Sequence, residues 1–338
     1  MKEDRATVVD FLLKVKGFGV SKVIMTSFDL DLFPLLDKEP LSIGELVARR
    51  RLNPVLAQSL MLVLQTSGFV TLQSGKYHLT DLARSVLPIY ANIKSWIEEM
   101  KQFFHRVDDL TQSLFDLDYQ KKIYSQNFYS SRVLSDVSAE AKVELFAKSM
   151  DGSQPEISEK ILNHFDFSRY NHMIDMGGGY GRFAMNVAKK YRNIHTTILD
   201  LPEVCEEARR KIAVEGLSDR VCFRAGSFFD PIFNCEADLV SFVRILTDWG
   251  EEQIELLLKN AYQALTPNGI VLIVEPIHEE SSEMGESSAI SGLMMALLGG
   301  GRRTVNDFMR FLSKAGFTEL NCTDLEWALY RLISARKA

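Results

Sequence analysis

The sequence predicts an α/β protein in two parts, a mostly helical N-terminal domain and a C-terminal doubly wound, parallel-rich sheet. Three observations predict this fold. The run Met173-Ile-Asp-Met-Gly-Gly-Gly-Tyr-Gly181 has apolar residues and an acid ahead of clustered glycines. From residue 170 onward, strand-like segments alternate with helix-like segments. Before residue 90 the pattern is helical and ends in a hairpin.

The glycine-rich run indicates a strand that leads directly into a tight turn and a helix. Glycine has no Cβ, so Gly177, Gly179 and Gly181 let the main chain turn sharply and let a ligand lie against it. Residues 182–191 carry apolar side chains at helical spacing, so the turn opens a helix whose N–H groups face the ligand. This arrangement is typical of a nucleotide-cofactor site, although a short glycine motif often marks only a tight connection.

Two kinds of cofactor fold compete for this turn. A dinucleotide-binding fold requires G-x-G-x-x-G, and here the sixth position counted from Gly177 is Arg182. The order of an acid, three glycines, one residue and a glycine instead resembles motif I of the class I S-adenosylmethionine (SAM) methyltransferases. The resemblance implies that Asp175 lies near the methionine ammonium and that the glycines admit the cofactor. These glycines are Gly177, Gly178, Gly179 and Gly181.

A second acid follows the next predicted strand. Residues 194–200 are rich in β-branched side chains and end at Asp200, 19 positions after Gly181. An acid at this distance can accept hydrogen bonds from both ribose hydroxyls of a cofactor. Asp200 also precedes Leu201-Pro202-Glu203, which gives it the position of a helix N-cap. Both interpretations can hold, and we favour ribose binding.

The composition is typical of a soluble enzyme. The chain has 338 residues, 46% of them hydrophobic, enough for two domains with cores. Its net charge of −6 disfavours nucleic acid as a partner. The four cysteines show neither metal-ligand spacing nor a disulfide framework, so we expect no metal and a reducing compartment. Because we find no signal peptide and no membrane-spanning run, we expect a cytoplasmic protein without a membrane partner.

Residues 1–90 are predicted to form a winged-helix-like domain. Ser42-Ile-Gly-Glu45 has capping-box spacing, and Asn53-Pro54 supplies an N-cap and a first-turn proline for a helix that ends near Ser67. Residues 69–72 and 77–79 then flank a four-residue turn. A helix, a capped helix, another helix and a two-stranded wing follow in order.

A winged helix often binds DNA, so a SAM-sensing regulator is an alternative of another class. Arg49-Arg50-Arg51 even supplies a basic cluster. However, the helix in the recognition position carries apolar side chains around most of its circumference, from Leu56 to Leu64. A helix in a DNA groove needs a polar face for phosphates and base edges. We therefore expect this helix to be buried and DNA recognition to be absent.

The rest of the chain divides at about residue 168. Residues 91–168 are predicted to be helices rich in aromatics, which connect the domains and roof a pocket. Residues 169–338 are predicted to form a Rossmann-like domain. We expect further strands at 221–224, 237–243, 269–274 and 327–335, and helices at 203–214, 251–264 and 305–315. Ligand should lie beyond the carboxyl ends of the strands, where Gly177, Asp200 and Gly226 converge.

Taken together, the chain resembles the winged-helix small-molecule O-methyltransferases from end to end. This group includes plant caffeate and hydroxyindole methyltransferases and bacterial enzymes that tailor polyketides and pigments. The matching stretches are Gly177–Gly181, Asp200-Leu-Pro202, Leu246-Thr-Asp-Trp249 and Gly300-Gly-Arg-Arg-Thr304. The resemblance implies SAM as cofactor, S-adenosylhomocysteine (SAH) as product, and an N-terminal dimerisation domain that makes a homodimer.

The cofactor residues of the family map well onto this chain. Where the family tends to have Gly-Asp-Met-Phe near the adenine, this chain has Gly226-Ser-Phe-Phe229. Ser227 can still form hydrogen bonds and Phe228 can still pack on the purine. We also expect cofactor contacts from Leu201, Phe242 and Arg244.

The catalytic residues map poorly. The family's general base is the histidine of His-Asp-Trp, and Thr247 occupies that position here. A threonine hydroxyl does not hold a proton reversibly near neutral pH. Glu275 matches a carboxylate that orients the histidine in the family, whereas Arg302 replaces the family's other supporting acid. Glu275, Asp248 and His278 are therefore candidate substitutes for the base.

Acceptor residues follow from motif positions, and core packing is the competing explanation for each. A flat, mainly apolar acceptor is indicated by Phe146, Met150, Met294 and Met295, and Arg302 supplies a counter-charge for an acidic group or lies in solvent. The predicted function is SAM-dependent methylation of a small aromatic or polycyclic metabolite in secondary metabolism, and we favour oxygen as the methylated atom. The enzymatic alternatives are a C- or N-methyltransferase and a family member diverted to hydroxylation or decarboxylation.

Overall fold

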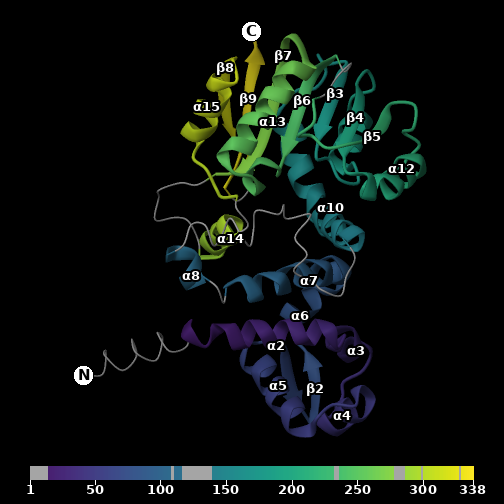
Figure 1. The fold of residues 1–338 in the computed structure, drawn as a ribbon. Helices are drawn as coiled ribbons and strands as arrows, with labels where there is room; N and C mark the ends of the chain where they lie inside the picture. The colour runs from purple at the N-terminus through teal and green to yellow at the C-terminus, as the bar shows by residue number, and fades with distance from the viewer. Residues whose placement is uncertain are drawn as a thin grey trace. The chain divides into compact units, whose positions relative to one another are not determined.

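The chain forms two compact units, the first ending at Glu98 and the second beginning at Glu99 (Figure 1). The computed structural model describes residues 14–107, 110–115, 139–231, 236–277, 286–297, 300–326 and 329–338. The boundary at Glu98 lies inside the region 91–168 that we expect to be a helical connection, and the three-part division stays a prediction. Within the described ranges, no helix has the length and apolar character that crossing a membrane requires.

The first unit is mostly helical and contains the predicted hairpin. Ser42 and Glu45 form a complete capping box, and the Asn53 side chain accepts hydrogen bonds from the N–H groups of Val55 and Leu56. Its elements are α2 (Gly17–Asp29), α3 (Leu32–Lys38), α4 (Ile43–Arg50), α5 (Pro54–Thr66), antiparallel β1 (Val70–Gln73) and β2 (Lys76–Leu79), α6 (Asp81–Ser85), η1 (Leu87–Ile89) and α7 (Tyr90–Val107), which continues past Glu98.

Helix α5 is only partly buried, which corrects our expectation of a buried helix. Met61 and Leu64 lie in the core, but Val55, Leu56 and Leu62 are 74%, 68% and 55% exposed. A helix that is apolar on all sides can turn only one face toward its own unit. The remaining apolar face of α5 is therefore uncovered in the single chain.

The second unit is built on a seven-stranded sheet in the order β5-β4-β3-β6-β7-β9-β8. The first five strands are parallel, and β9 runs antiparallel to β7 and β8. The strands are β3 (His172–Met176), β4 (His195–Asp200), β5 (Val221–Ala225), β6 (Ala237–Val243), β7 (Leu265–Pro276), β8 (Phe317–Asp324) and β9 (Tyr330–Lys337). The predicted parallel-rich, doubly wound sheet is confirmed, and β8 is an addition to it.

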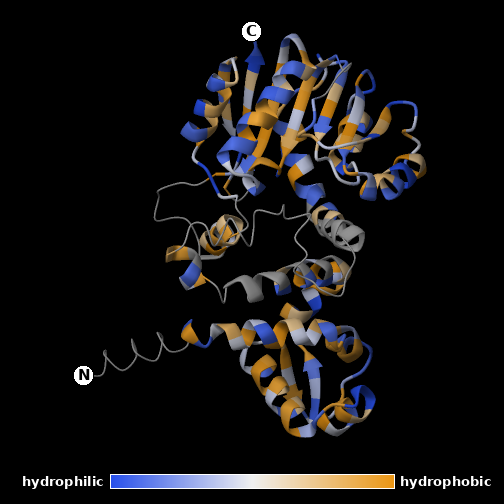
Figure 2. Ribbon diagram, viewed as in Figure 1, coloured by the Kyte–Doolittle hydropathy of each residue, from blue (hydrophilic) through white to orange (hydrophobic). Residues whose placement is uncertain are grey.

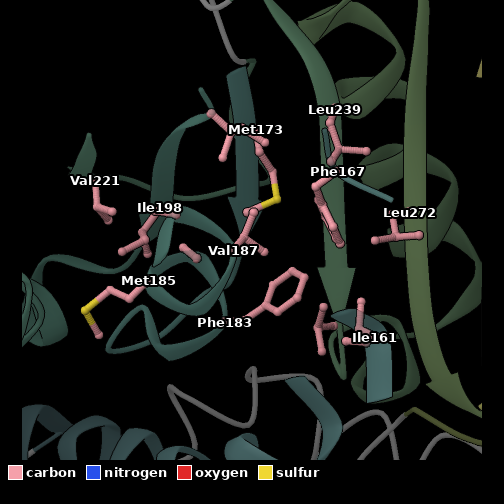
Figure 3. Packing of buried hydrophobic residues seen from close by; sticks show 14 of the residues in the cluster. Ile161, Phe167, Met173, Phe183, Met185, Val187, Ile198, Val221, Leu239 and Leu272 are labelled. Carbon is pink, nitrogen blue, oxygen red and sulfur yellow. The ribbon is translucent and has the colours of Figure 1, made fainter. Parts of the chain in front are cut away.

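Helices cover both faces of this sheet. Core residues of α10, α11 and α12 pack in one cluster, and core residues of α13 and α15 pack in another. Figure 3 shows Phe167 of the first cluster beside Leu239 and Leu272 of the sheet, and Ile161 and Phe183 belong to the same cluster. In Figure 2 the central strands are mostly hydrophobic, whereas α12 and α15 carry both kinds of residue. The helices and 3-10 turns of this unit are α8 (Leu110–Phe115), α10 (Ala139–His164), α11 (Arg182–Lys190), η2 (Pro202–Val204), α12 (Cys205–Val214), η3 (Leu246–Asp248), α13 (Glu251–Ala264), α14 (Glu286–Leu297) and α15 (Val305–Lys314).

The parallel strands place their carboxyl ends along one edge of the sheet. β3 ends at Met176, β4 at Asp200, β5 at Ala225 and β6 at Val243. The glycine turn, Asp200, Gly226 and the segment after Val243 therefore meet at this edge, where open α/β sheets bind ligands.

Candidate cofactor and catalytic site

The glycine turn after β3 requires glycine for two separate reasons. Gly177, Gly179 and Gly181 have φ angles of 71°, 55° and 80°, which side-chain-bearing residues rarely adopt. The backbone also lies tightly against its surroundings. A Cβ on Gly177 would lie 2.5 Å from Cδ1 of Ile245, and a Cβ on Gly178 would lie 2.5 Å from Oδ2 of Asp175. Gly181 is the N-cap of α11, so its turn directs the first helical N–H groups to the sheet edge.

Asp200 is held against the glycine turn by its own carboxylate. Oδ2 accepts a hydrogen bond from the Gly179 N–H at 2.6 Å, and Oδ1 accepts one from the Leu201 N–H at 2.7 Å. Burial raises the pKa of Asp200, and these two hydrogen bonds oppose the rise. The N-cap interpretation is wrong, because the following turn η2 has Leu201 at its N-cap and no side-chain cap. The ribose interpretation stays a prediction.

Asp175 is buried beneath the glycine turn. Its Oδ1 accepts a hydrogen bond of 2.7 Å from Ser241 Oγ on the neighbouring strand β6. Burial raises the pKa of Asp175 to about 7, although the Ser241 hydroxyl opposes the rise. The carboxylate still borders the cavity above the turn, so a cationic group bound there would favour its charged form.

Two adjoining cavities meet at Gly177 and Asp200. The larger holds about 670 Å³ of empty space, partly open to solvent, and is lined by Ala147, Met150, Asp151, Gln154, Asp175, Gly177, Gly178, Gly179, Tyr180, Arg182, Asp200, Val204, Val243, Arg244 and Ile245. The smaller holds about 450 Å³ and is lined by Gly177, Asp200, Leu201, Gly226, Ser227, Phe228, Phe229 and Trp249.

The two cavities differ in chemical character. Aromatic rings line the smaller cavity. The ring of Trp249 packs edge to face on Phe228 and Phe229, with distances between ring centroids of 5.9 Å and 4.7 Å. Asn260 Nδ2 fixes this wall by donating to the carbonyls of Phe228 and Phe229. Such a wall suits a flat heterocycle. The larger cavity is bordered by carboxylates and guanidinium groups, so it suits a ligand that carries both signs of charge.

Glu275 and Thr247 form a buried polar pair at the end of β7. Glu275 is completely buried, and its Oε1 accepts hydrogen bonds from the N–H groups of Ile245 and Leu246 at 2.7 and 2.6 Å. Its Oε2 accepts a hydrogen bond of 2.7 Å from the Thr247 hydroxyl. Burial raises the pKa of Glu275 to about 7, and these donors oppose the rise. The carboxylate thus fixes the turn 245–247, and the Ile245 side chain of this turn packs against Gly177.

The glycine-rich stretch after α14 packs on the same turn. The Gly301 N–H donates to the Thr247 carbonyl at 2.9 Å, and Gly300 lies so close to that carbonyl that a Cβ would collide with it. Arg303 Nη2 donates to the Trp249 carbonyl at 2.6 Å. Glu275, η3 and the stretch 300–304 are therefore connected by hydrogen bonds beside the two cavities. In the part of the chain that the structure describes, we find no cluster of three metal-ligating side chains.

Comparison with known proteins identifies the family of the chain. A model of the O-methyltransferase domain matches residues 107–318, and a model of the O-methyltransferase dimerisation domain matches residues 13–88. The first match alone covers more than half of the chain. The chain belongs to the O-methyltransferase family. It is therefore a SAM-dependent methyltransferase by family, with a helical dimerisation domain ahead of the catalytic domain, as the sequence predicted.

Individual relatives are similar over nearly their whole length. The tetracenomycin polyketide synthesis 8-O-methyl transferase TcmO of Streptomyces glaucescens is 27% identical over 93% of this chain and 92% of its own. The acetylserotonin O-methyltransferase of Gallus gallus is 28% identical over 90% of each chain. The structure of human N-acetylserotonin methyltransferase in complex with SAM matches with a TM-score of 0.78 at 25% identity, covering 98% of both chains.

Most of the predicted cofactor residues of the methyltransferase lie at the two cavities. Asp175, Gly177, Gly178, Gly179, Asp200 and Arg244 line the larger, and Leu201, Gly226, Ser227 and Phe228 line the smaller. Gly181 acts through the backbone as the helix cap. Phe242 is a correction, because it is fully buried among residues of α13 and α15. Neighbouring residues of a strand face opposite sides, so Ser241 faces Asp175 while Phe242 faces away.

The candidate catalytic and acceptor residues are only partly gathered. Asp248 is half-buried at the end of η3, and His278 and the Phe146 side chain lie outside the described residues. Met150 lines the larger cavity. Met294 and Met295 are half-buried on α14, where Arg302 packs against Gly292. Burial lowers the pKa of Arg302.

Several lining residues were not predicted from the sequence. Asp151 and Gln154 come from α10, and Trp249 closes the aromatic wall. In the sequence, Arg182 stands out only because it breaks the dinucleotide fingerprint. In the sequence, Asp151 and Arg182 are marked only by their neighbours, since Asp151 follows the predicted site residue Met150 and Arg182 follows Gly181.

Proposed function

We propose that the enzyme methylates an oxygen of a small aromatic or polycyclic metabolite without a histidine base. The observation that carries this proposal is the pairing of Thr247 with Glu275. At the position of the family's imidazole stands a hydroxyl that donates to a buried carboxylate. Glu275 already accepts three hydrogen bonds, so it serves the turn 245–247 as a positioning residue.

The residues of the two cavities suit SAM, and we propose these roles for them. Asp200 would accept hydrogen bonds from the ribose hydroxyls at the point where the cavities meet. Phe228 and Trp249 would enclose the adenine, while Asp175 and the bare glycine backbone would face the methionine end. Bound SAM supplies an electrophilic methyl group on a positively charged sulfur. The protein's own task is to hold the acceptor in line and to exclude water.

Positioning can sustain methyl transfer when general base catalysis is lost. A general base contributes about 10² to 10⁴ in rate. Orientation of the reacting groups can supply roughly 7 to 11 kcal/mol, which is the larger share. We therefore expect an acceptor that needs no strong base, such as a carboxylate or an acidic phenol.

The acceptor class is supported by the relatives and by the cavity wall. The names of two relatives specify a tetracenomycin polyketide and acetylserotonin as what they act on or help to make. Met150 borders the larger cavity, and thioether side chains adapt to flat apolar surfaces. An aromatic or polycyclic acceptor fits both observations.

A product assay tests the proposed function. Purified enzyme incubated with SAM and metabolite extracts should release SAH together with an O-methylated product. Methylation at carbon or nitrogen, or hydroxylation or decarboxylation, would assign the enzyme to one of the alternative reactions. DNA binding with no turnover in any extract would favour the regulator.

The Thr247→His variant tests the role of this position. An imidazole there should raise turnover of a weakly acidic phenol by about tenfold or more and introduce a pH dependence near 6 to 7. The pH profile of kcat, measured beside the wild type, checks this. Unchanged turnover and an unchanged profile would mean that residue 247 is remote from the reacting atom.

A further inference from the structure

One turn of α10 roofs the larger cavity. Met150, Asp151 and Gln154 all line it, facing the glycine turn and Arg244. Met150 is also a candidate acceptor contact. The position of this turn therefore affects both the cofactor cavity and the acceptor side of the site.

Asp151 ties this turn to the elements that hold the cofactor. Its carboxylate accepts two hydrogen bonds from Arg182, at 2.7 Å from Nε and 2.8 Å from Nη2, and one of 2.9 Å from Lys211 Nζ. Arg182 is the first residue of α11, directly after the glycine turn, and Lys211 lies on α12. The Asp151 side chain is 11% exposed, and those of Arg182 and Lys211 are 34% and 23% exposed, so these ion pairs are partly shielded from solvent.

The protonation state of Asp151 agrees with this arrangement. Burial opposes ionisation, but hydrogen bonds and charge from Arg182 and Lys211 outweigh it and hold the pKa of Asp151 below its ordinary value. The side chain is therefore charged at neutral pH, and the ion pairs are fully formed.

A second tether, from Arg244, fixes the same turn. Arg244, just after β6, donates from Nη2 to the Met150 carbonyl at 2.9 Å and to Gln154 Oε1 at 2.5 Å. Arg244 has a φ angle of 60°, which lies in the left-handed region that residues other than glycine rarely adopt. The turn 150–154 is thus held by cations from α11, α12 and the end of β6.

From this geometry we infer that Asp151 is a positioning residue that couples cofactor binding to the order of the turn 150–154. The inference rests on the proposed function. A cofactor that settles on the glycine turn also fixes Arg182, and through Asp151 it fixes Met150 on the acceptor side. Methyl transfer needs this coupling, because a displacement of about 1 Å can cost about 100-fold in rate.

Hydrogen exchange and SAH titration test the coupling with full-length protein. In the wild type, SAH should slow amide exchange across the turn 150–154. Asp151→Asn keeps the shape of the side chain but loses its charge. This variant should lose most of the SAH-induced protection and bind SAH about tenfold more weakly. Glu255→Gln is the matched control, since it breaks the exposed Lys314–Glu255 pair and should leave both readouts unchanged.

A double-mutant cycle separates coupling from simple destabilisation. Asp151→Asn, Arg182→Gln and the double variant should show non-additive losses of SAH affinity, with the double variant no weaker than the worse single variant. Additive losses, or wild-type SAH-induced protection in Asp151→Asn, would overturn the inference. Failure of the wild type itself to bind SAH would instead overturn the proposed function.

Discussion

At the residue scale, the most informative group is the buried carboxylate of Glu275. It lies at the end of a central strand with no exposed surface, and every hydrogen bond that it accepts comes from the turn 245–247. Burial raises its pKa to about 7, and burial does the same for Asp175. Two carboxyl groups of this domain therefore titrate near neutrality.

The raised pKa of Glu275 predicts a pH-dependent stability. Between about pH 4.5 and 7 the folded state retains a proton that the unfolded state releases, so the free energy of unfolding falls as pH rises. Each unit of pKa shift corresponds to about 1.4 kcal/mol. Glu275→Gln cannot ionise at this position, and its slope across this window should be shallower than that of the wild type, with Asp175 and Asp200 contributing to the remaining slope. Urea unfolding at pH 5, 6 and 7 measures the slopes, and equal slopes would contradict the assignment.

At the element scale, the strand-turn-helix unit β3-turn-α11 forms the cradle that we propose for the cofactor. Two side chains from outside this strand-turn-helix leave no space for a Cβ on its glycines. They are Ile245, which precedes η3, and Ile198, which belongs to β4. The turn is therefore shaped by long-range packing as well as by its own backbone angles.

Gly178→Ala should damage this cradle without unfolding the domain. The new Cβ would lie 2.5 Å from Asp175 Oδ2, so the buried carboxylate would have to move. We expect SAH affinity to fall at least about tenfold, a loss of roughly 1.4 kcal/mol. Gly44→Ala is the control, because a Cβ there meets nothing within 4 Å and alanine favours the helix α4. Calorimetric titration with equal affinity for Gly178→Ala and wild type would refute the steric argument.

The helices and strands differ in how far the sequence predicts them. The alternation of apolar segments located β3, β4, β6 and β7, because buried parallel strands form continuous hydrophobic runs. For the same reason, the sequence does not show which face of the sheet Phe242 occupies, because apolar and polar residues do not alternate along β6. Strand β8 escaped prediction because most of its side chains are exposed and polar. Asp151 could not be identified as a tether, because its cationic partners lie 31 and 60 positions away.

At the scale of the whole molecule, the uncovered apolar face of the first unit points to a homodimer, which we propose. Val55, Leu56 and Leu62 of α5 are exposed together with Phe18 of α2, and all four lie inside the match to the dimerisation domain. A second copy of the chain is the partner that the family implies.

Charge on this face should separate the copies. The wild type should elute with twice the 38.3 kDa mass of the chain, and Leu56→Asp combined with Leu62→Asp should shift it toward the mass of one chain. Light scattering after size-exclusion chromatography reads this directly. Val214→Asp, at a 75% exposed apolar position on α12, is the control and should stay dimeric. A dimeric double variant would place the interface elsewhere.

We propose above all that the sheet edge at Gly177 and Asp200 holds an adenosyl cofactor. Calorimetric titration with SAH measures this most directly. We expect one site per chain in the wild type and an affinity about tenfold or more weaker in Asp200→Asn, which keeps the side-chain shape but loses the charge. A wild-type protein that releases no heat and shows no affinity for SAH or SAM would contradict it.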